Sequence, residues 1–341
     1  MGGGVEINQN GLINHVKTYL SWSRAFAAKK VIYSLLCLAG YLQGVGRVRR
    51  IGVVGLGLMG SAIAQRLRGG GFDVAGYDID AGKCASLAER GGEPVATLAA
   101  LASLCDTIFV AVFDTAQVEL VIEGADGLLS ARPVSSPRPT FICTSTCDPA
   151  RIAKLAARIE LRANFIEMPV SGTSGQVLKG EGVGLVAGAR DVVDAAAPAL
   201  DAVCPERQYL GAVGNGGKAK LAVNLVLGLN RGAIAEGLVF AESMGLEPVA
   251  FLDVLRNSAA YSQVMDIKGA AMARREFQNP VSRVDQSYKD FSLMLEYARA
   301  LGQELPFAKV YAELLDGCMA AGEGQWDNAA ILAAIARRRA G

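Results

Sequence analysis

A glycine-rich turn near residue 55 constrains this 341-residue chain more than any other feature. The β-branched run at residues 51–54 leads into Gly55-Leu56-Gly57-Leu58-Met59-Gly60, and a helical pattern follows. In a strand–turn–helix of this kind, the first glycine permits the turn and the second lets the backbone approach a pyrophosphate. The third lets the helix pack closely on the strand. Free amides at the helix start attract phosphate, so the motif predicts a dinucleotide-binding loop.

An acidic residue follows the second predicted strand, residues 72–77, at the place where such folds bind a ribose. The Asp78 carboxylate can accept hydrogen bonds from the 2′ and 3′ hydroxyls, and it would repel a 2′-phosphate. No arginine follows in Tyr77-Asp78-Ile79-Asp80. We therefore expect NAD as the cofactor, with NADP less favoured. The alternative is that Asp78 only ends the strand or caps a helix.

Composition excludes several classes of protein. The formal net charge is +1, so no basic surface indicates nucleic acid binding. Seven cysteines without paired C-x-x-C spacing argue against a zinc site or a disulfide framework, and they favour a reducing cytoplasm. The single histidine, His15, precedes the glycine turn, so proton transfer near neutral pH falls to Lys, Tyr, Cys or a carboxylate. We expect no metal.

Residues 1–48 do not continue the pattern of the fold that follows. The apolar run at residues 31–42 is too short to cross a bilayer as a helix, and no clean cleavage site follows it. We expect a dispensable extension on a cytoplasmic protein that does not enter a membrane.

From residue 49 the pattern alternates between strands and helices. Strands are expected at residues 51–54, 73–77, 107–113, 140–144, 165–168, 184–187 and 208–210. This alternation predicts an α/β fold with a doubly wound, mostly parallel Rossmann-type sheet, which we assign to a cofactor-binding domain at residues 49–213.

After Gly214 the strand signal ends. Residues 216–244 predict one helix of about 28 residues, roughly 40 Å long at the standard rise. Further helices are expected at residues 248–258, 262–275, 287–300, 306–321 and 328–338, with Gly245, Gly302 and Gly322 as C-caps. We assign residues 214–341 to an all-α domain for substrate binding and dimerisation. Its apolar character predicts a homodimer or homotetramer.

Five motifs in order resemble those of the β-hydroxyacid dehydrogenases, the family of 3-hydroxyisobutyrate dehydrogenase and relatives of 6-phosphogluconate dehydrogenase. The resemblance covers about residues 49–336. Its motifs are the glycine turn at 55–60 (G-L-G-x-M-G), Thr144-Ser145-Thr146 (the S-T turn), Pro169-Val170-Ser171-Gly172 (P-V-S-G), residues 214–224 (G-x-G-x-x-x-K-x-x-N-N) and Tyr288-Lys289-Asp290-Phe291 (K-D-L). The sequence departs from the family at three points: Thr173 replaces the second glycine of S-G-G, Val223 replaces the first asparagine of N-N, and the residue before the S-T turn is not acidic. Thr173 adds bulk and a hydroxyl where the backbone usually meets a carboxylate, which predicts an unusual substrate with the chemistry retained.

The resemblance implies roles for individual residues. Lys220 is the general acid/base and Asn224 holds the reacting oxygen. Four residues apart on a helix, they share a face, and burial would lower the pKa of the lysine. The alternative is that Lys218 and Lys220 are both surface charges. Ser171, Gly172 and Thr173 are expected to bind the substrate carboxylate, and Thr146 to reach the nicotinamide side of the pocket. Lys289 is expected to lie over the cofactor–substrate cleft from the helical domain. Val112, Phe113 and Asp114 close the third strand and are expected to contact the adenosine or pyrophosphate of the cofactor.

Together these expectations predict NAD-dependent oxidation of a small β-hydroxy acid of the 3-hydroxyisobutyrate type. One alternative is an NADPH-dependent reductase of a small aldehyde acid, such as 2-hydroxy-3-oxopropionate or succinic semialdehyde. Another is a non-catalytic dinucleotide-binding module that serves assembly.

Overall fold

The computed structural model describes residues 50–338 of the chain. The predicted N-terminal extension, its apolar run and His15 lie outside the described residues.

The strands of the described chain form one sheet in the order β3-β2-β1-β4-β5-β6-β8-β7, with β9 paired to β8. The neighbours from β3 to β6 are all parallel, whereas β8 runs antiparallel to β6. This order confirms the doubly wound, mostly parallel sheet. The strands are β1 Arg50–Val54, β2 Asp73–Tyr77, β3 Glu93–Pro94, β4 Thr107–Val110, β5 Thr140–Cys143, β6 Asn164–Glu167, β7 Val170–Ser171, β8 Val183–Gly188 and β9 Glu206–Tyr209.

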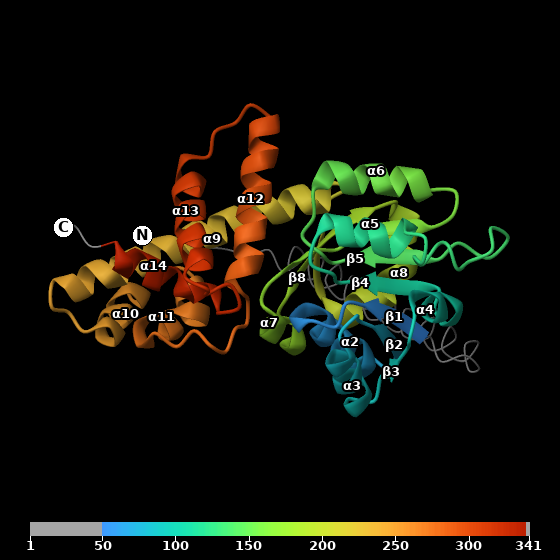
Figure 1. The fold of residues 1–341 in the computed structure, drawn as a ribbon, viewed down its shortest axis with the longest axis horizontal. Helices are drawn as coiled ribbons and strands as arrows, with labels where there is room; N and C mark the ends of the chain where they lie inside the picture. Colours follow the sequence, from blue (N-terminus) through green and yellow to red (C-terminus); the bar gives the residue numbers. More distant parts are fainter. Residues whose placement is uncertain (1–49, 339–341) are drawn as a thin grey trace, which may run out of the picture. The chain divides into compact units, whose positions relative to one another are not determined.

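Helices cover both faces of the sheet, because its strands are apolar on both sides. Figure 1 shows α5 and α6 on one face and α2 on the other. Ile63 and Leu67 of α2 are fully buried in one core, and Ile122 of α5 and Ile152 of α6 in the other. The helices of this half are α2 Leu58–Gly69, α3 Ala81–Glu89, α4 Leu98–Leu104, α5 Thr115–Glu123, α6 Pro149–Ile159, α7 Ser174–Lys179 and α8 Arg190–Val203.

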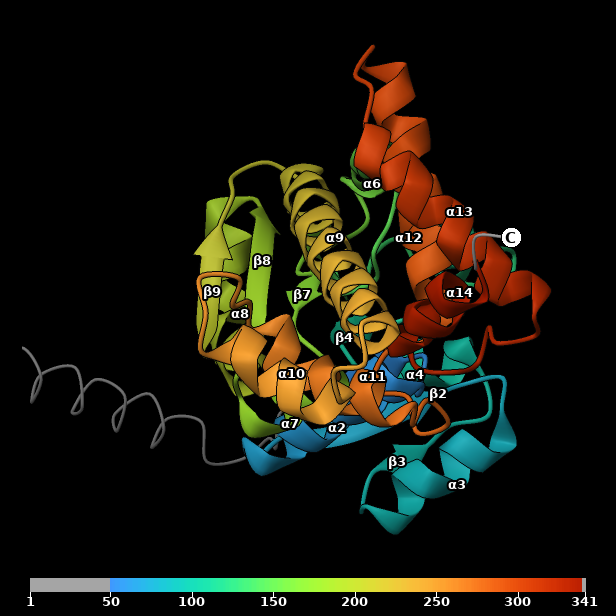
Figure 2. The same cartoon turned by 90° about the vertical axis from the view of Figure 1, so that its left-hand side faces the viewer.

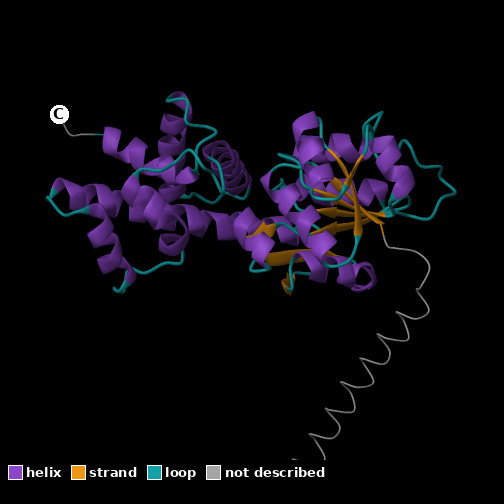
Figure 3. Cartoon of the chain, turned by 90° about the horizontal axis from the view of Figure 1, so that it is seen from below, coloured by secondary structure: helices purple, strands orange, loops and turns teal. Residues whose placement is uncertain are grey.

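The second half is helical and has its own core, which the strands do not enter (Figure 3). The predicted long helix is present as α9 Asn215–Ser243, and α10, α12, α13 and α14 pack against it (Figure 2). The other elements are α10 Pro248–Arg256, the π-helical turn η1 Met265–Gly269, α11 Ala270–Arg274, α12 Val284–Ala300, α13 Pro306–Ala320, the 3₁₀ turn η2 Asn328–Ala330 and α14 Ile331–Arg337.

By length and composition, α9 could also cross a membrane. In the described chain it serves instead as the central helix of the second half, and it carries Lys220, Asn224 and Arg231.

Three predicted elements differ from the structure. The strand expected at 107–113 ends at Val110, because its partners in β1 and β5 end at Val54 and Cys143. The helix expected at 262–275 is the π-turn η1 followed by α11, and the helix expected at 328–338 begins with the 3₁₀ turn η2. The short elements β3, β7 and α7 were not predicted. Gly245, Gly302 and Gly322, expected as C-caps, lie one residue beyond the C-caps of α9, α12 and α13 and have positive φ angles of 85°, 71° and 77°.

Candidate active site

A cleft of about 770 Å³ receives residues from both halves of the described chain. The glycine turn, the loops after β4 and β5, and the β7–α7 segment line it from the sheet half, and α9, η1 and α12 line it from the helical half. The predicted site residues that line it are Gly55, Gly57, Leu58, Met59, Asp78, Val112, Phe113, Thr146, Ser171, Gly172, Thr173, Lys220, Asn224 and Lys289. Leu56, Gly60 and Asp114 do not.

The three glycines of the turn differ in the space that a side chain would meet. Gly55 has φ +84°, and a Cβ there would lie 2.5 Å from the carbonyl oxygen of Ala111. A Cβ at Gly60 would lie 1.8 Å from the carbonyl oxygen of Gly55. At Gly57 a Cβ would meet nothing within 4 Å. The first and third glycines therefore permit close packing, and the second leaves open space at the start of α2.

Asp78 stabilises the turn and keeps acceptor capacity for a ribose. Its Oδ2 accepts a hydrogen bond from the Leu56 amide at 2.7 Å, and its Oδ1 accepts one from the Asp80 amide at 2.9 Å. Lys83 Nζ also donates to Oδ1 at 3.5 Å, so of about four lone-pair sites on the carboxylate one remains free. Lys83 of α3, which was not predicted, has its Nζ 3.5 Å from Asp78 Oδ1 and also lines the cleft. Its charge offsets part of the repulsion that a 2′-phosphate would meet.

The three predicted residues that do not line the cleft have structural roles. Leu56 has its side chain buried and gives its amide to Asp78. Gly60 lets α2 approach the turn. Asp114 is the N-cap of α5 and accepts a hydrogen bond from the Gln117 amide at 2.8 Å. These residues shape the site without facing it.

Lys220 lies inside the cleft wall, one helical turn before Asn224 on α9. It is 8% exposed, and its Nζ donates a hydrogen bond to the Val170 carbonyl at 2.7 Å. Burial lowers the pKa of Lys220 to about 8; the nearby Asp290 opposes this shift and Lys289 adds to it. Lys218 is exposed and bonds to Asn215. Lys220 is therefore not a surface charge, whereas Lys218 is.

Asp290 connects Asn224 to the sheet half, a role that was not predicted. Its Oδ2 accepts a hydrogen bond from Asn224 Nδ2 at 2.9 Å, and its Oδ1 lies 3.0 Å from Lys289 Nζ. Lys289 in turn donates to the carbonyls of Phe113 and Thr146, both at 2.9 Å. Lys289 therefore holds the loops after β4 and β5 against α12. In the sequence, this role of Asp290 was indicated by nothing more than its position directly after Lys289.

The expected substrate loop is partly helical. Thr173 is the N-cap of α7: its hydroxyl accepts from the Gln176 amide at 3.3 Å, and its own amide donates to Gln176 Oε1 at 2.9 Å. The amide and hydroxyl that were expected to bind a carboxylate are thus engaged within α7. Ser171 and Gly172 line the cleft, and Gly172 has φ +139°.

Glu167, at the end of β6, anchors the start of α9. Its carboxylate is 3% exposed and accepts hydrogen bonds from the amides of Gly214 and Gly217. Burial raises the pKa of Glu167, and these amides oppose the rise. A Cβ at Gly216 would lie 2.9 Å from the Leu185 carbonyl, so glycine is required for this approach. Lys220 follows one turn later, so its position depends on this anchor.

Within residues 50–338, no group of three or more His, Cys, Asp or Glu side chains could hold a metal ion. The six described cysteines are free, and all but Cys84 are buried. Burial raises the pKa of Cys105 and Cys318 to about 12, which disfavours the reactive thiolate.

The sequence matches two family descriptions in succession. Residues 50–211 match the NAD binding domain of 6-phosphogluconate dehydrogenase. Residues 214–335 match the domain described as NAD-binding of NADP-dependent 3-hydroxyisobutyrate dehydrogenase.

Individual proteins show the same likeness over most of the chain. L-threonate dehydrogenase of Cupriavidus necator is 30% identical over 83% of this chain and 95% of its own length. The 2-hydroxy-3-oxopropionate reductase of Escherichia coli is 30% identical over 84% of this chain and 97% of its own. The crystal structure of a 3-hydroxyisobutyrate dehydrogenase from Salmonella typhimurium superposes with a TM-score of 0.76 at 27% identity, covering 84% of this chain and 99% of that one. Because the likeness spans both halves of the described chain, the protein belongs to the β-hydroxyacid dehydrogenase family of NAD(P)-dependent oxidoreductases, which includes 3-hydroxyisobutyrate dehydrogenase.

Proposed function

We propose that the protein oxidises a small β-hydroxy acid of the 3-hydroxyisobutyrate type with NAD, and that Lys220 is the general acid/base. The observation that carries the proposal is the state of Lys220. It is buried in the wall of the cleft that also receives the glycine turn, and its pKa is lowered to about 8. A lysine with such a pKa can both accept and donate a proton near neutral pH.

The chain's own residues account for binding and proton transfer. The nicotinamide ring, when bound, supplies the hydride acceptor for oxidation and the hydride donor for reduction. Neutral Lys220 accepts the proton of the substrate hydroxyl, and protonated Lys220 returns it in the reverse direction. The bond from Nζ to Val170 and the bond from Asn224 to Asp290 fix the two side chains that face the oxygen. Ser171, Gly172 and Thr173 border the cleft where the substrate carboxylate is expected.

The choice of cofactor and direction forms part of the proposal. Asp78 favours NAD, since a free carboxylate repels a 2′-phosphate. The second candidate is NADPH-dependent reduction of a small aldehyde acid of the 2-hydroxy-3-oxopropionate or succinic semialdehyde type. Two observations favour it: Lys83 lies beside Asp78, and one 30% identical relative is named 2-hydroxy-3-oxopropionate reductase. A non-catalytic module would not need a buried lysine with a lowered pKa at this position.

A substrate panel tests the proposal. NADH or NADPH formation is followed with 3-hydroxyisobutyrate, 3-hydroxypropionate, 4-hydroxybutyrate, glycerate, threonate and serine, and the corresponding aldehyde acids are assayed for reduction. We expect turnover of a hydroxy acid with NAD preferred. Preference for NADP would reject our interpretation of Asp78, and no turnover of any acid despite cofactor binding would reject the activity.

Variants of α9 test the role of Lys220. Lys220→Met should lower kcat by about 10²–10⁴-fold, the range for loss of a general acid/base, with cofactor affinity retained. Lys218→Met on the same helix is the matched control, because Lys218 is exposed. Equal activity of the two variants would remove Lys220 from the mechanism.

We also propose that the protein is a cytoplasmic homodimer or homotetramer. Phe240 of α9 and Phe307 of α13 are 64% and 74% exposed, and burying such side chains favours self-association. Sedimentation velocity measures the assembly directly, and a monomer at micromolar concentration would contradict it.

A further inference from the structure

The cleft extends along α9 beyond the two residues assigned to the chemistry. Lys220, Asn224, Leu227 and Arg231 all line it, and their spacing of four, three and four residues places them on one face of the helix. The Cα atoms of Lys220 and Arg231 are about 16 Å apart along the axis, at 1.5 Å per residue. Long side chains on a helix lean toward its N-terminus, and this holds for Lys220 and Arg231 alike.

Close helix packing fixes the position of Arg231. A Cβ at Gly228 would lie 2.4 Å from the ring of Phe291 on α12, and one at Gly232 would lie 3.0 Å from the ring of Tyr311 on α13. Arg231 Nη1 donates a hydrogen bond at 2.9 Å to the hydroxyl of Tyr311, whose side chain is buried. The guanidinium group is therefore held in place before any ligand binds.

Within the described residues, Arg231 has N–H donors without an acceptor, and its positive charge has no ion-pair partner. A guanidinium group carries five N–H donors. Its Nε is buried and makes no hydrogen bond, and no carboxylate of residues 50–338 forms an ion pair with it. A partly buried cation without an ion-pair partner costs free energy, which an anionic ligand in the cleft would recover.

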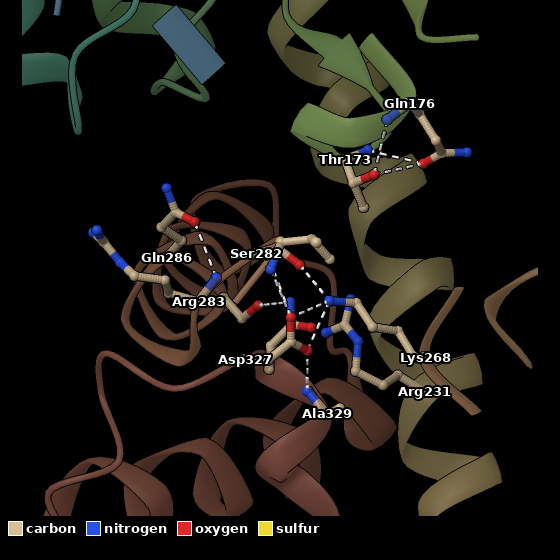
Figure 4. A network of polar contacts seen from close by, with 12 residues as sticks. Thr173, Gln176, Arg231, Lys268, Ser282, Arg283, Gln286, Asp327 and Ala329 are labelled. Atoms are coloured by element: carbon tan, nitrogen blue, oxygen red, sulfur yellow. Dashed lines mark hydrogen bonds and ion pairs between the residues drawn. The ribbon is translucent and has the colours of Figure 1, made fainter. Parts of the chain in front are cut away.

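The neighbouring cation, Lys268 of η1, is already neutralised. Its Nζ donates to Ser282 Oγ at 2.9 Å and to the two carboxylate oxygens of Asp327 at 2.7 and 2.6 Å, so all three of its donors are used. Figure 4 shows Arg231 beside this pair, with Asp327 bonded to Lys268 and not to Arg231. The group of Arg231, Lys268 and Asp327 therefore carries one net positive charge, located on the side chain with free donors.

We propose that Arg231 is a specificity residue that binds a second carboxylate, carried on the tail of the substrate. The substrate class is then a hydroxy acid with two acidic groups: one lies near Ser171 and Gly172, and the other pairs with Arg231. A guanidinium group binds a carboxylate through its N–H donors, and here the Nη groups supply them, because Nε is buried. This inference rests on the proposed function, because it assigns the tail of a substrate whose hydroxyl faces Lys220.

The test compares two substrates that differ in the tail. 2-(Hydroxymethyl)glutarate carries a second carboxylate, and 3-hydroxyisobutyrate carries a methyl group at the same carbon. We expect kcat/KM to favour the dicarboxylate by at least tenfold in the wild type. Arg231→Met should abolish this preference while changing kcat/KM for 3-hydroxyisobutyrate less than about threefold, and Arg231→Lys should restore part of it. A phosphate-tailed hydroxy acid preferred over the dicarboxylate would overturn the carboxylate assignment.

Two further variants separate recognition from folding. Tyr311→Phe removes the hydroxyl that holds Arg231, and it should reduce the preference for the dicarboxylate by less than Arg231→Met does. Arg299→Met is the matched control, because Arg299 is exposed on α12 and does not line the cleft. Thermal denaturation confirms that each variant is folded. Equal losses on both substrates in Arg231→Met, or no dicarboxylate preference in the wild type, would overturn the inference.

A binding measurement keeps this inference distinct from the proposed function. 2-(Hydroxymethyl)glutarate is titrated calorimetrically into wild type and Arg231→Met in the presence of NAD. Dicarboxylate binding that requires Arg231 supports the inference even where no hydroxy acid is turned over, an outcome that would reject only the activity. Binding that is absent, or equal in the two proteins, overturns it.

Discussion

Two buried lysines, Lys220 and Lys268, show how one residue type serves two purposes in this protein. Burial lowers the pKa of each to about 8. Lys268 is paired with Asp327 at 2.6 Å, whereas the hydrogen bond of Lys220 goes to the neutral carbonyl of Val170. The charge on Lys268 is therefore compensated and structural. The charge on Lys220 is not neutralised by an ion pair, which leaves its proton available for transfer.

The lowered pKa of Lys220 gives the two reaction directions opposite pH dependence. Oxidation needs the neutral amine, so its kcat should rise as pH increases through about 8, the pKa of Lys220. Reduction needs the ammonium, so its kcat should fall through the same range. Initial rates in both directions across this range check the prediction. Profiles that change in the same sense in both directions would contradict it.

The same two lysines should affect stability in opposite ways. A lowered lysine pKa means that the folded state gives up its proton before the unfolded state does. Below about pH 8 the folded state bears the full free-energy cost of the buried ammonium. The free energy of unfolding then rises as the pH increases from about 8 toward 10.5, the ordinary lysine pKa. Near neutral pH, Lys220→Met should therefore stabilise the protein by up to roughly 3 kcal/mol. Lys268→Met leaves Asp327 buried without its partner and should destabilise by about 3–5 kcal/mol. Urea denaturation of both variants measures this, and changes of the same sign would refute the contrast.

Among the elements, α9 carries Lys220, Asn224 and Arg231, and its packing fixes where they lie. Its N-terminus is anchored by Glu167, and its middle approaches α12 and α13 at Gly228 and Gly232. A clash at Gly228 would separate α9 from Phe291, the neighbour of Asp290, and so disturb the bond from Asp290 to Asn224.

Two glycines of α9 allow a matched test of this packing. Gly228→Ala places a methyl group 2.4 Å from the Phe291 ring and should destabilise by about 1–3 kcal/mol. Gly237→Ala meets nothing within 4 Å and should stabilise by about 0.5–1 kcal/mol, because alanine is the better helix former. Thermal denaturation compares them. A stable Gly228→Ala variant would show that α12 can move away freely.

Most elements could be predicted from the sequence because their signals are local. Short β-branched or apolar runs indicated β1 and β2, and apolar residues at helical spacing, followed by Gly245, indicated α9. The apolar residues Ala111, Val112 and Phe113 led to a predicted strand that continued beyond Val110. The strand ends at Val110 because its pairing with β1 and β5 ends there. The roles of Asp290, Glu167 and Arg231 depend on partners 66, 47 and 80 residues away, which no local pattern reports. The capping box at Thr173 and Gln176 was local and readable.

On the scale of the whole molecule, Lys289 links the two halves of the described chain. From α12 it bonds to the loops after β4 and β5 through the carbonyls of Phe113 and Thr146. Its charge also contributes to lowering the pKa of Lys220. One side chain therefore influences both the arrangement of the cleft and the proton affinity of the proposed base.

Loss of Lys289 should be visible in the pH profile as well as in the rate. Lys289→Met should lower kcat/KM by at least about tenfold, because positioning across the cleft is lost. It should also move the midpoint of the oxidation profile to higher pH, since a cation near Lys220 is removed and Asp290 remains. Lys309→Met, at an exposed position of α13, is the control. An unchanged midpoint would mean that Lys289 acts on geometry alone.

The single face of α9 that carries Lys220, Asn224 and Arg231 has a consequence for how such an enzyme can diversify. Proton transfer and tail recognition lie on different turns of one rigid element. A substitution at position 231 can therefore change which acid is accepted without moving the reacting groups. Transferring the arginine to position 227, one turn closer to Lys220, would shift the anion site by about 6 Å and select a shorter homologue. Chain-length selectivity would then be set by the helical register, and the two substitutions that move the arginine, at positions 227 and 231, would leave Lys220 and Asn224 in place.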